Sequence, residues 1–171
     1  MNIISEIVMS NTAPRTRRPP EEQARLEVRL REVFEECFPF NRLMGIKVET
    51  LDPRQPKISF GMRQELVGSY MHSRLHGGAI ATALDTVGGL AVTLAVAEKH
   101  ADETVEQLAQ RFTRCGTIDL RVDYLNPGVG KRFSATATVM RLGGKIASVR
   151  MELHNDAGVL VAIGSAAYAV S

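Results

Sequence analysis

The sequence predicts an α+β domain in which a curved antiparallel sheet wraps around one long helix. The stretch from Gly77 to Ala97 contains 21 residues, and Asp85 is the only charged one among them. A helix that is apolar nearly all round must be covered by protein on most of its sides. The last third of the chain is a run of strands joined by tight turns, which is typical of an antiparallel sheet. A sheet curved around the helix would supply the cover.

Length and composition agree with one globular domain. The chain has 171 residues, of which 44% are hydrophobic and 23% are charged, and these values exclude a wholly disordered chain. We expect a flexible leader over residues 1–20 and a single domain over residues 21–171. The net charge of +2 gives no electrostatic reason to expect nucleic acid as a partner. Aromatic residues are scarce, so the core must be built from aliphatic and small side chains.

The elements before the long helix follow from periodicity and proline. Apolar residues recur at helical spacing over residues 21–38, and Pro39 should end that helix. The segment "FNRLMG" then makes a short connection. We expect strands over residues 45–51 and 57–62, followed by the loop "RQELVGSYMHSRLHGG". The long helix closes near residue 100, and a polar helical segment covers about residues 103–113.

The strands after this point alternate clearly. In the segment 117–125, four apolar residues (Ile118, Leu120, Val122 and Tyr124) face one way, whereas Thr117 and three charged residues face the other. The segment "NPGVG" makes a turn. Further strands are expected over residues 133–142, 145–154 and 159–170, with Gly143 and Gly144 at the turn between the first two.

Several other classes of protein are disfavoured. The long helix could cross a bilayer by length, but ten of its residues are Gly or Ala and an acid lies near its middle. The N-terminus is a poor secretory signal, so we expect a cytoplasmic protein without a membrane span. Cys37 and Cys115 have no partner at metal-ligand or disulfide spacing. His72 and His76 lack a third ligand, so no metal site is expected.

The candidate catalytic groups lie at the start and in the middle of the long helix. His76, Gly77 and Gly78 come directly before it, where unpaired backbone N–H groups could form an oxyanion hole. The alternative is that the glycines only make a sharp turn. Asp85 follows nine residues after His76 and is surrounded on its helix by small residues. A lone acid there is costly unless it is partnered or functional, or unless it lies on a thin strip exposed to solvent.

These motifs resemble a known family. "LHGGAIATALD" followed by "GTIDLRVDYLNPG" resembles the hotdog-fold acyl-CoA thioesterases of the PaaI type. "PFNRLMGIKVE", "LVGSYMHSRLHGG" and "ELHND" look closer to the YigI-like branch of medium/long-chain acyl-CoA thioesterases. The resemblance covers about residues 40–170.

The resemblance implies catalytic roles for four residues. The Gly77 N–H would polarise the thioester carbonyl, and Asp85 would act as general base on water or attack directly. Thr117 would help to hold the water, and His76 would orient the site. The resemblance also implies a homodimer, possibly paired into a tetramer, in which Gly77 of one protomer faces Asp85 of the other.

The resemblance places coenzyme A along the strand ends, as part of the substrate and with no separate cofactor. Arg141 and Lys145 would contact its phosphates, although both could equally be ordinary surface charges. Tyr70 stands where PaaI-type enzymes commonly have Asn, and the YigI-like branch carries an aromatic residue there. The residues expected to bind substrate or coenzyme A are Tyr70, Gly78, Asn126, Pro127, Gly128, Arg141, Gly143, Gly144 and Lys145.

Three other functions on the same fold stay open at this point. The chain could bind acyl-CoA without hydrolysing it, although its leader is too short for a helix-turn-helix. It could act on an aryl-acyl-CoA of the phenylacetyl type. It could also be a dehydratase or hydratase, but the His–acid pair typical of those enzymes is not found.

Overall fold

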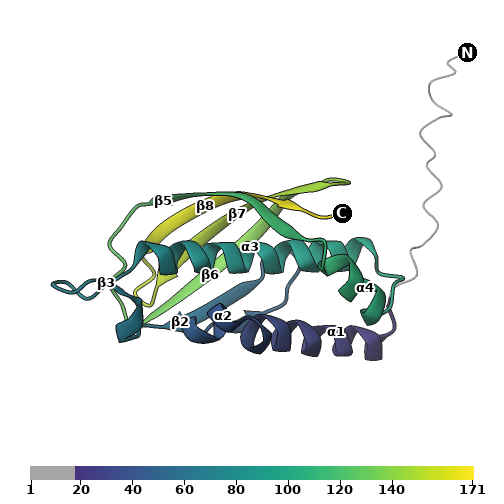
Figure 1. Ribbon diagram of the computed structural model, residues 1–171, viewed down its shortest axis with the longest axis horizontal. Coiled ribbons are helices and arrows are strands. Elements are labelled where there is room, and N and C mark those ends of the chain that lie inside the picture. Colours follow the sequence, from purple (N-terminus) through teal and green to yellow (C-terminus); the bar gives the residue numbers. More distant parts are fainter. Residues whose placement is uncertain (1–17) are drawn as a thin grey trace, which may run out of the picture.

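The computed structural model describes residues 18–171, and most of the predicted leader lies outside these residues. Figure 1 shows one long helix lying along a strongly curved sheet, with shorter helices below it and to its right. The helical elements are α1 (Pro20–Glu32), the π-helical turn η2 (Val33–Cys37), α2 (Pro39–Met44), the 3₁₀ turn η3 (Gln64–Leu66), α3 (Gly77–Lys99) and α4 (Val105–Phe112).

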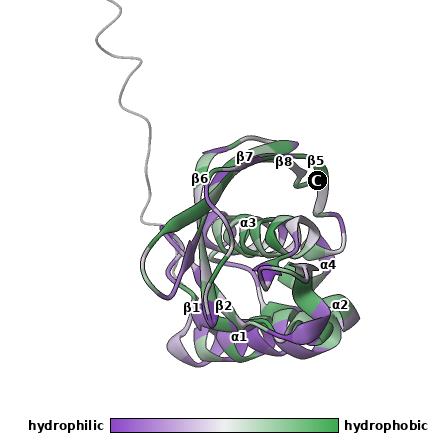
Figure 2. Cartoon of the chain, turned by 90° about the vertical axis from the view of Figure 1, so that its left-hand side faces the viewer, coloured by the Kyte–Doolittle hydropathy of each residue, from purple (hydrophilic) through white to green (hydrophobic). Residues whose placement is uncertain are grey.

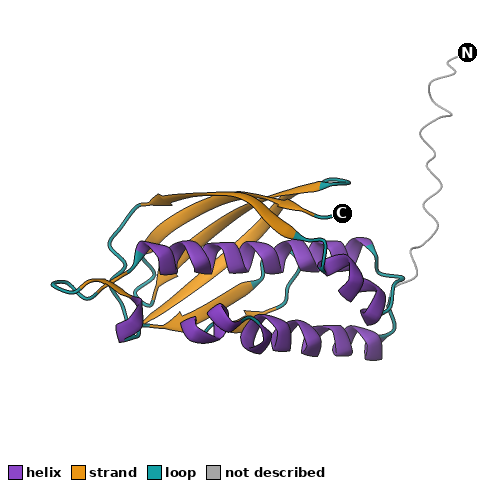
Figure 3. Cartoon of the chain, viewed as in Figure 1, coloured by secondary structure: helices purple, strands orange, loops and turns teal. Residues whose placement is uncertain are grey.

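The sheet is antiparallel, as expected, and has six strands in the order β1-β2-β6-β7-β8-β5. Figure 3 shows these strands as one strongly curved layer that lies above and behind α3. Two very short strands pair separately as a small hairpin. The strands are β1 (Lys47–Thr50), β2 (Lys57–Gly61), β3 (Val67–Ser69), β4 (Arg74–Leu75), β5 (Gly116–Tyr124), β6 (Arg132–Leu142), β7 (Ile146–Asn155) and β8 (Leu160–Ala169).

Helix α3 is the centre of the core. In the end-on view of Figure 2 the sheet curves around it, and α1, α2 and α4 cover its remaining sides. Leu84, Val87, Leu90 and Ala91 of α3 are fully buried. By length and composition α3 could cross a membrane, but 67% of its most apolar window is buried inside the protein. This is the hotdog arrangement that the sequence predicted.

The first helix ends differently from the prediction. The expected helix over residues 21–38 is α-helical only to Glu32 and then continues as the π-helical turn η2. Pro39 does follow an extended residue, Phe38, but it begins a second helix, α2, rather than a loop. Proline is favoured at the first position of a helix because its missing N–H would be unpaired there in any case. The predicted connection "FNRLMG" is therefore mostly helical.

A second difference concerns strand β5, where the regular alternation is interrupted. Thr117 pairs with Tyr168 and Asp119 pairs with the next residue, Ala167, so Ile118 is an extra residue in a bulge. A bulge reverses which side chains face the core. Ile118 is consequently 55% exposed, while Thr117 lies on the side of the helix together with Leu120. The predicted alternation had placed Thr117 on the opposite face.

Candidate active site

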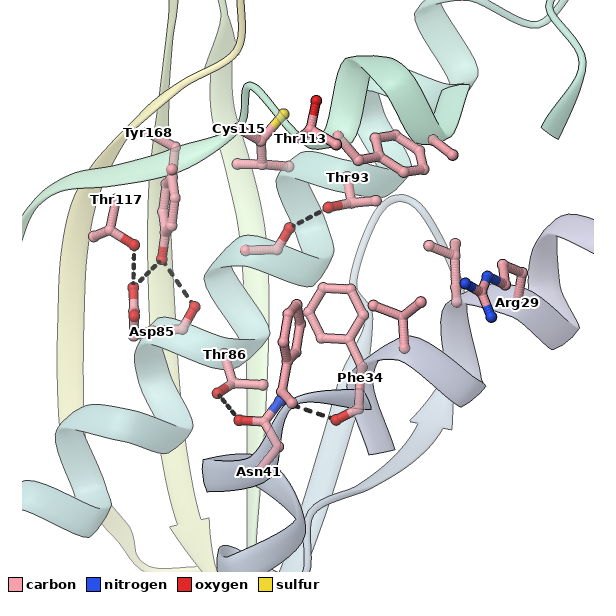
Figure 4. A pocket seen from close by; sticks show the side chains of 18 of the residues that line it. Arg29, Phe34, Asn41, Asp85, Thr86, Thr93, Thr113, Cys115, Thr117 and Tyr168 are labelled. Atoms are coloured by element: carbon pink, nitrogen blue, oxygen red, sulfur yellow. Dashed lines mark hydrogen bonds between the residues drawn. The ribbon is translucent and has the colours of Figure 1, made fainter. Parts of the chain in front are cut away.

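The carboxylate of Asp85 is held by two hydroxyl groups from the sheet. Thr117 Oγ1 donates to Asp85 Oδ1 at 2.9 Å, and the Tyr168 hydroxyl lies 3.1 Å from the same oxygen and 3.0 Å from the Asp85 carbonyl. Figure 4 shows both side chains converging on Asp85 from neighbouring strands. Among residues 18–171 no donor contacts the other oxygen, Oδ2, in the structure. One oxygen is thus fixed and the other is available for chemistry.

Tyr168 is a site residue that the sequence did not reveal. It lies on β8, where the other helix-facing residues are small, and its side chain is only 3% exposed. Gly88 makes room for it, because a Cβ at that position would overlap the Tyr168 hydroxyl. Burial and then the negative charge of Asp85 raise the pKa of Tyr168 well above its usual range. Tyr168 therefore remains a proton donor to Asp85. The single aromatic residue in an otherwise Ala- and Gly-rich strand face was the only signal in the sequence.

The N-terminus of α3 is organised by His76. This residue has extended backbone angles (φ −65°, ψ 137°), and its Nδ1 accepts from the Gly78 N–H at 2.8 Å. Its own N–H donates to the Leu66 carbonyl at 2.8 Å. Gly68 of β3 packs so closely that a Cβ there would clash with the His76 Cα. The small hairpin β3–β4 thus fixes His76, in a segment that the sequence had predicted to be a loop.

Gly77 begins α3, and its backbone is oriented by Tyr124. The Tyr124 hydroxyl donates to the Gly77 carbonyl at 3.1 Å. No acceptor for the Gly77 N–H is found within residues 18–171. Gly77 precedes Asp85 by eight residues, which corresponds to about 12 Å along a helix. Within one protomer these two groups therefore cannot contact the same carbonyl group.

A cavity of about 560 Å³ opens beside Asp85. It lies between α1, η2 and α4 on one side and α3 on the other. The start of β5 and the end of β8 also contribute to its wall. Its wall is mostly apolar. Cys115 contributes to that wall, and burial raises the pKa of its thiol, so the sulfur stays protonated. Thr93 also lines the cavity but turns its hydroxyl to the Gly89 carbonyl at 2.8 Å.

The π-helical turn shapes the cavity wall near Asp85. In η2 the Phe38 N–H bonds to the Val33 carbonyl, which leaves the Phe34 carbonyl without its usual helical donor. Asn41 supplies that donor at 2.9 Å and also accepts from Thr86 at 3.2 Å. Phe34 and Phe38 then meet edge to face, with ring centroids 5.5 Å apart. Asn41, which the sequence did not single out, thereby anchors these two rings to α3.

Of the four predicted catalytic residues, the structure brings Asp85 and Thr117 into direct contact. His76 and Gly77 lie together with Gly78 at the N-terminus of α3, about two turns before Asp85. Tyr70 is 88% exposed in the turn of the small hairpin and contacts none of these residues by a hydrogen bond. Within one protomer, the glycine-rich start of α3 and the Asp85 carboxylate are thus separated by about two turns of the helix.

The residues predicted to bind coenzyme A also fall into two groups. Asn126, Pro127 and Gly128 lie near the start of α3, where Asn126 donates to Leu160 and Gly128 accepts from Leu75 at 2.8 Å. The second group lies in and beside the turn between β6 and β7, next to the opposite end of β8. These two ends of β8, Leu160 and Ala169, are about 30 Å apart, at about 3.3 Å for each of nine residues. The second group consists of Arg141, Gly143, Gly144 and Lys145.

Metal ligation gains no support within residues 18–171, which contain no cluster of three or more His, Cys, Asp or Glu side chains able to hold an ion. The polar groups closest to Asp85 are the hydroxyls of Thr117 and Tyr168.

Comparison with known proteins identifies the family. The family model of the Thioesterase superfamily matches residues 72–162, which include the start of α3, Asp85 and Thr117. The chain belongs to this superfamily. The medium/long-chain acyl-CoA thioesterases YigI of Escherichia coli K12 and of Salmonella typhimurium are each 42% identical over 139 residues, covering 81% of this chain and 90% of the relative. A solved structure from Shewanella oneidensis, described as related to the thioesterase superfamily, is 40% identical and has a TM-score of 0.83, covering 89% of this chain and 99% of that one.

Proposed function

We propose that this thioesterase-superfamily member hydrolyses acyl-CoA thioesters to the free acid and coenzyme A, with medium- or long-chain fatty acyl groups as its substrates. The observation that carries the proposal is a carboxylate, Asp85, held by two hydroxyls at the side of a largely apolar cavity. Such cavities take apolar groups and orient them through a few polar atoms. The similarity to the YigI enzymes supports the same substrate class.

In the proposed reaction, Asp85 Oδ2 takes a proton from a water molecule as that water attacks the thioester carbonyl carbon. The Thr117 and Tyr168 hydroxyls keep Oδ1 in place, so the carboxylate does not have to reorganise. The carbon–sulfur bond then breaks, and coenzyme A leaves as a thiolate that takes up the proton held by Asp85, which regenerates the carboxylate. The products are the carboxylic acid and the thiol.

Two copies of the chain would build the complete site. A backbone N–H at the start of a helix is suited to stabilising the negative oxygen of the intermediate, but Gly77 lies about 12 Å along α3 from the Asp85 of its own protomer. Strand β5 forms one edge of the sheet, and Ile118 and Tyr124 on it are more than half exposed. Pairing of two copies along this edge would bring Gly77 of one protomer towards Asp85 of its partner, and would join the two groups of predicted coenzyme A contacts.

Replacing Asp85 by Asn tests the proposed reaction. Asn keeps an oxygen that can accept from Thr117 and Tyr168 but cannot take up the proton of water. We expect kcat on dodecanoyl-CoA to fall by about 10²–10⁴-fold, with an unchanged thermal unfolding midpoint. Full activity of Asp85→Asn would contradict the role of Asp85. Single turnover in ¹⁸O-water is the companion measurement, because label incorporated into the Asp85 carboxylate would indicate direct attack rather than base catalysis.

Mixing two inactive variants tests the shared site. Gly77→Pro removes the N–H donor, and the extended His76 before it suits a proline at the first position of a helix. After Gly77→Pro and Asp85→Asn dimers are unfolded and refolded together, about half of the dimers would be mixed, each with one intact site. Activity of about a quarter of the wild-type value is therefore expected. No recovery above the separate variants would exclude a site shared between protomers.

A further inference from the structure

The cavity beside Asp85 continues along α3 well beyond the carboxylate. Going from Asp85 towards the C-terminus of the helix, it is lined by Gly89, Val92 and Thr93, and α4 faces them with Val105 and Phe112. Asp85 and Thr93 are eight residues apart, or about 12 Å along the helix axis. The cavity is therefore long as well as apolar, and an extended chain bound at Asp85 would lie along α3.

At one position of α3, the wall of this cavity has no side chain. Gly89 lies one turn after Asp85, and a Cβ built on it would meet no atom within 4 Å. The neighbouring Gly88 differs, because Tyr168 and Met151 occupy the space beside it. A glycine inside a helix costs about 1 kcal/mol relative to alanine. Packing within the protomer explains Gly88 but gives no reason for Gly89.

The polar groups near Gly89 are already paired within the protein. The Gly89 carbonyl accepts from Thr93, whose hydroxyl is thereby withdrawn from the cavity. The Thr86 hydroxyl, on the same side of α3, is bonded to Asn41. Figure 4 shows Thr93 and Thr86 with these bonds, and Phe34 facing them. The space over Gly89 is thus suited to methylene groups rather than to a polar ligand.

We propose that the acyl chain passes directly over Gly89. The absence of a side chain at this position then determines whether the enzyme accepts long acyl groups. The inference rests on the proposed acyl-CoA hydrolysis and adds the residue that determines chain length. Short acyl groups end before they reach Gly89, whereas long ones need the open space above it.

Substitution of Gly89 by Ala and by Leu tests this, using a series of acyl-CoA substrates from butyryl to palmitoyl. Each methylene group that is kept out of an apolar site lowers the binding constant about fourfold. If Gly89→Leu keeps out about three methylene groups or more, kcat/KM for dodecanoyl-CoA should fall by at least about 50-fold. The kcat/KM for butyryl-CoA should stay within about twofold, since Asp85 is untouched. Gly89→Ala should have an intermediate profile and raise Tm by about 2–4 °C, because alanine is the better helix former.

The matched control is Ala95→Leu, which places the same leucine side chain at a partly exposed position of α3 outside the cavity. Its chain-length profile should match that of the wild type. An equal loss at every chain length for Gly89→Leu, or an unchanged profile, would overturn the role of Gly89. Failure of the wild type to hydrolyse any acyl-CoA would instead overturn the proposed function. In that case, calorimetric binding of S-dodecyl-CoA and S-butyl-CoA, which cannot be hydrolysed, still measures whether Gly89→Leu excludes only the longer chain.

Discussion

The two faces of α3 are built from similar small and apolar residues but are packed in opposite ways. On the sheet face, Leu84 and Val87 are fully buried, and the gap at Gly88 is filled by the Tyr168 side chain. On the cavity face, Asp85 and Gly89 remain partly exposed and nothing fills the space beside Gly89. Two consecutive glycines therefore have different roles. One admits a side chain that holds the Asp85 carboxylate, and the other leaves space that no side chain of the protomer fills.

Gly88→Ala should give the largest change in stability, because it forces the filled face to accept an extra methyl group. The new Cβ would displace the Tyr168 hydroxyl from Asp85 and contact the Met151 sulfur. Overpacking of this kind costs about 1–3 kcal/mol, and thioester hydrolysis should fall with it. The free energies of unfolding of Gly88→Ala and Gly89→Ala in urea should be compared. Gly88→Ala should be less stable than the wild type, whereas Gly89→Ala should not. Equal free energies of unfolding for the two variants would show that the faces do not differ.

Tyr168→Phe should give a smaller change that depends on pH. At neutral pH the loss of a hydroxyl that donates to Asp85 should cost about 1 kcal/mol. The raised pKa of Tyr168 means that above pH 10 the unfolded chain releases a proton that the folded protein retains. Wild-type stability should therefore fall as pH rises above 10, by up to about 1.4 kcal/mol per pH unit from this group, and Tyr168→Phe should lack that part of the slope.

Urea midpoints at pH 8, 10 and 11 would measure this slope. The control is Tyr70→Phe, which measures the effect of removing a tyrosine hydroxyl from an exposed turn that does not contact Asp85. Parallel curves for the wild type and Tyr168→Phe would mean that Tyr168 ionises equally in the folded and unfolded states.

The sequence predicted the sheet and the long helix because their periodicity extends over many residues. It also identified Asp85, since a single charged residue within a long apolar helical segment can be recognised from the sequence alone. It did not predict Tyr168, because the contact between Tyr168 and Asp85 joins elements 83 residues apart. The sequence does not predict helix α2, because a proline after a helical segment indicates a helix end as readily as the first position of a new helix, which Pro39 occupies. The orientation of Thr117 depends on a single extra residue in β5, which no periodicity reveals.

The order of the elements along the chain has a consequence for synthesis. Helix α3 ends at residue 99, whereas β5, β6, β7 and β8, which cover it, are complete only at residue 169. Ribosomes add about 5–20 residues per second, so the strands that complete the cover of α3 are finished several seconds after the helix itself. During that time it has the length and hydropathy of a membrane segment. An aspartate at the centre of such a helix opposes insertion into a bilayer by about 3 kcal/mol. The carboxylate proposed to activate water in the finished enzyme would thus also help to keep the nascent chain out of the membrane.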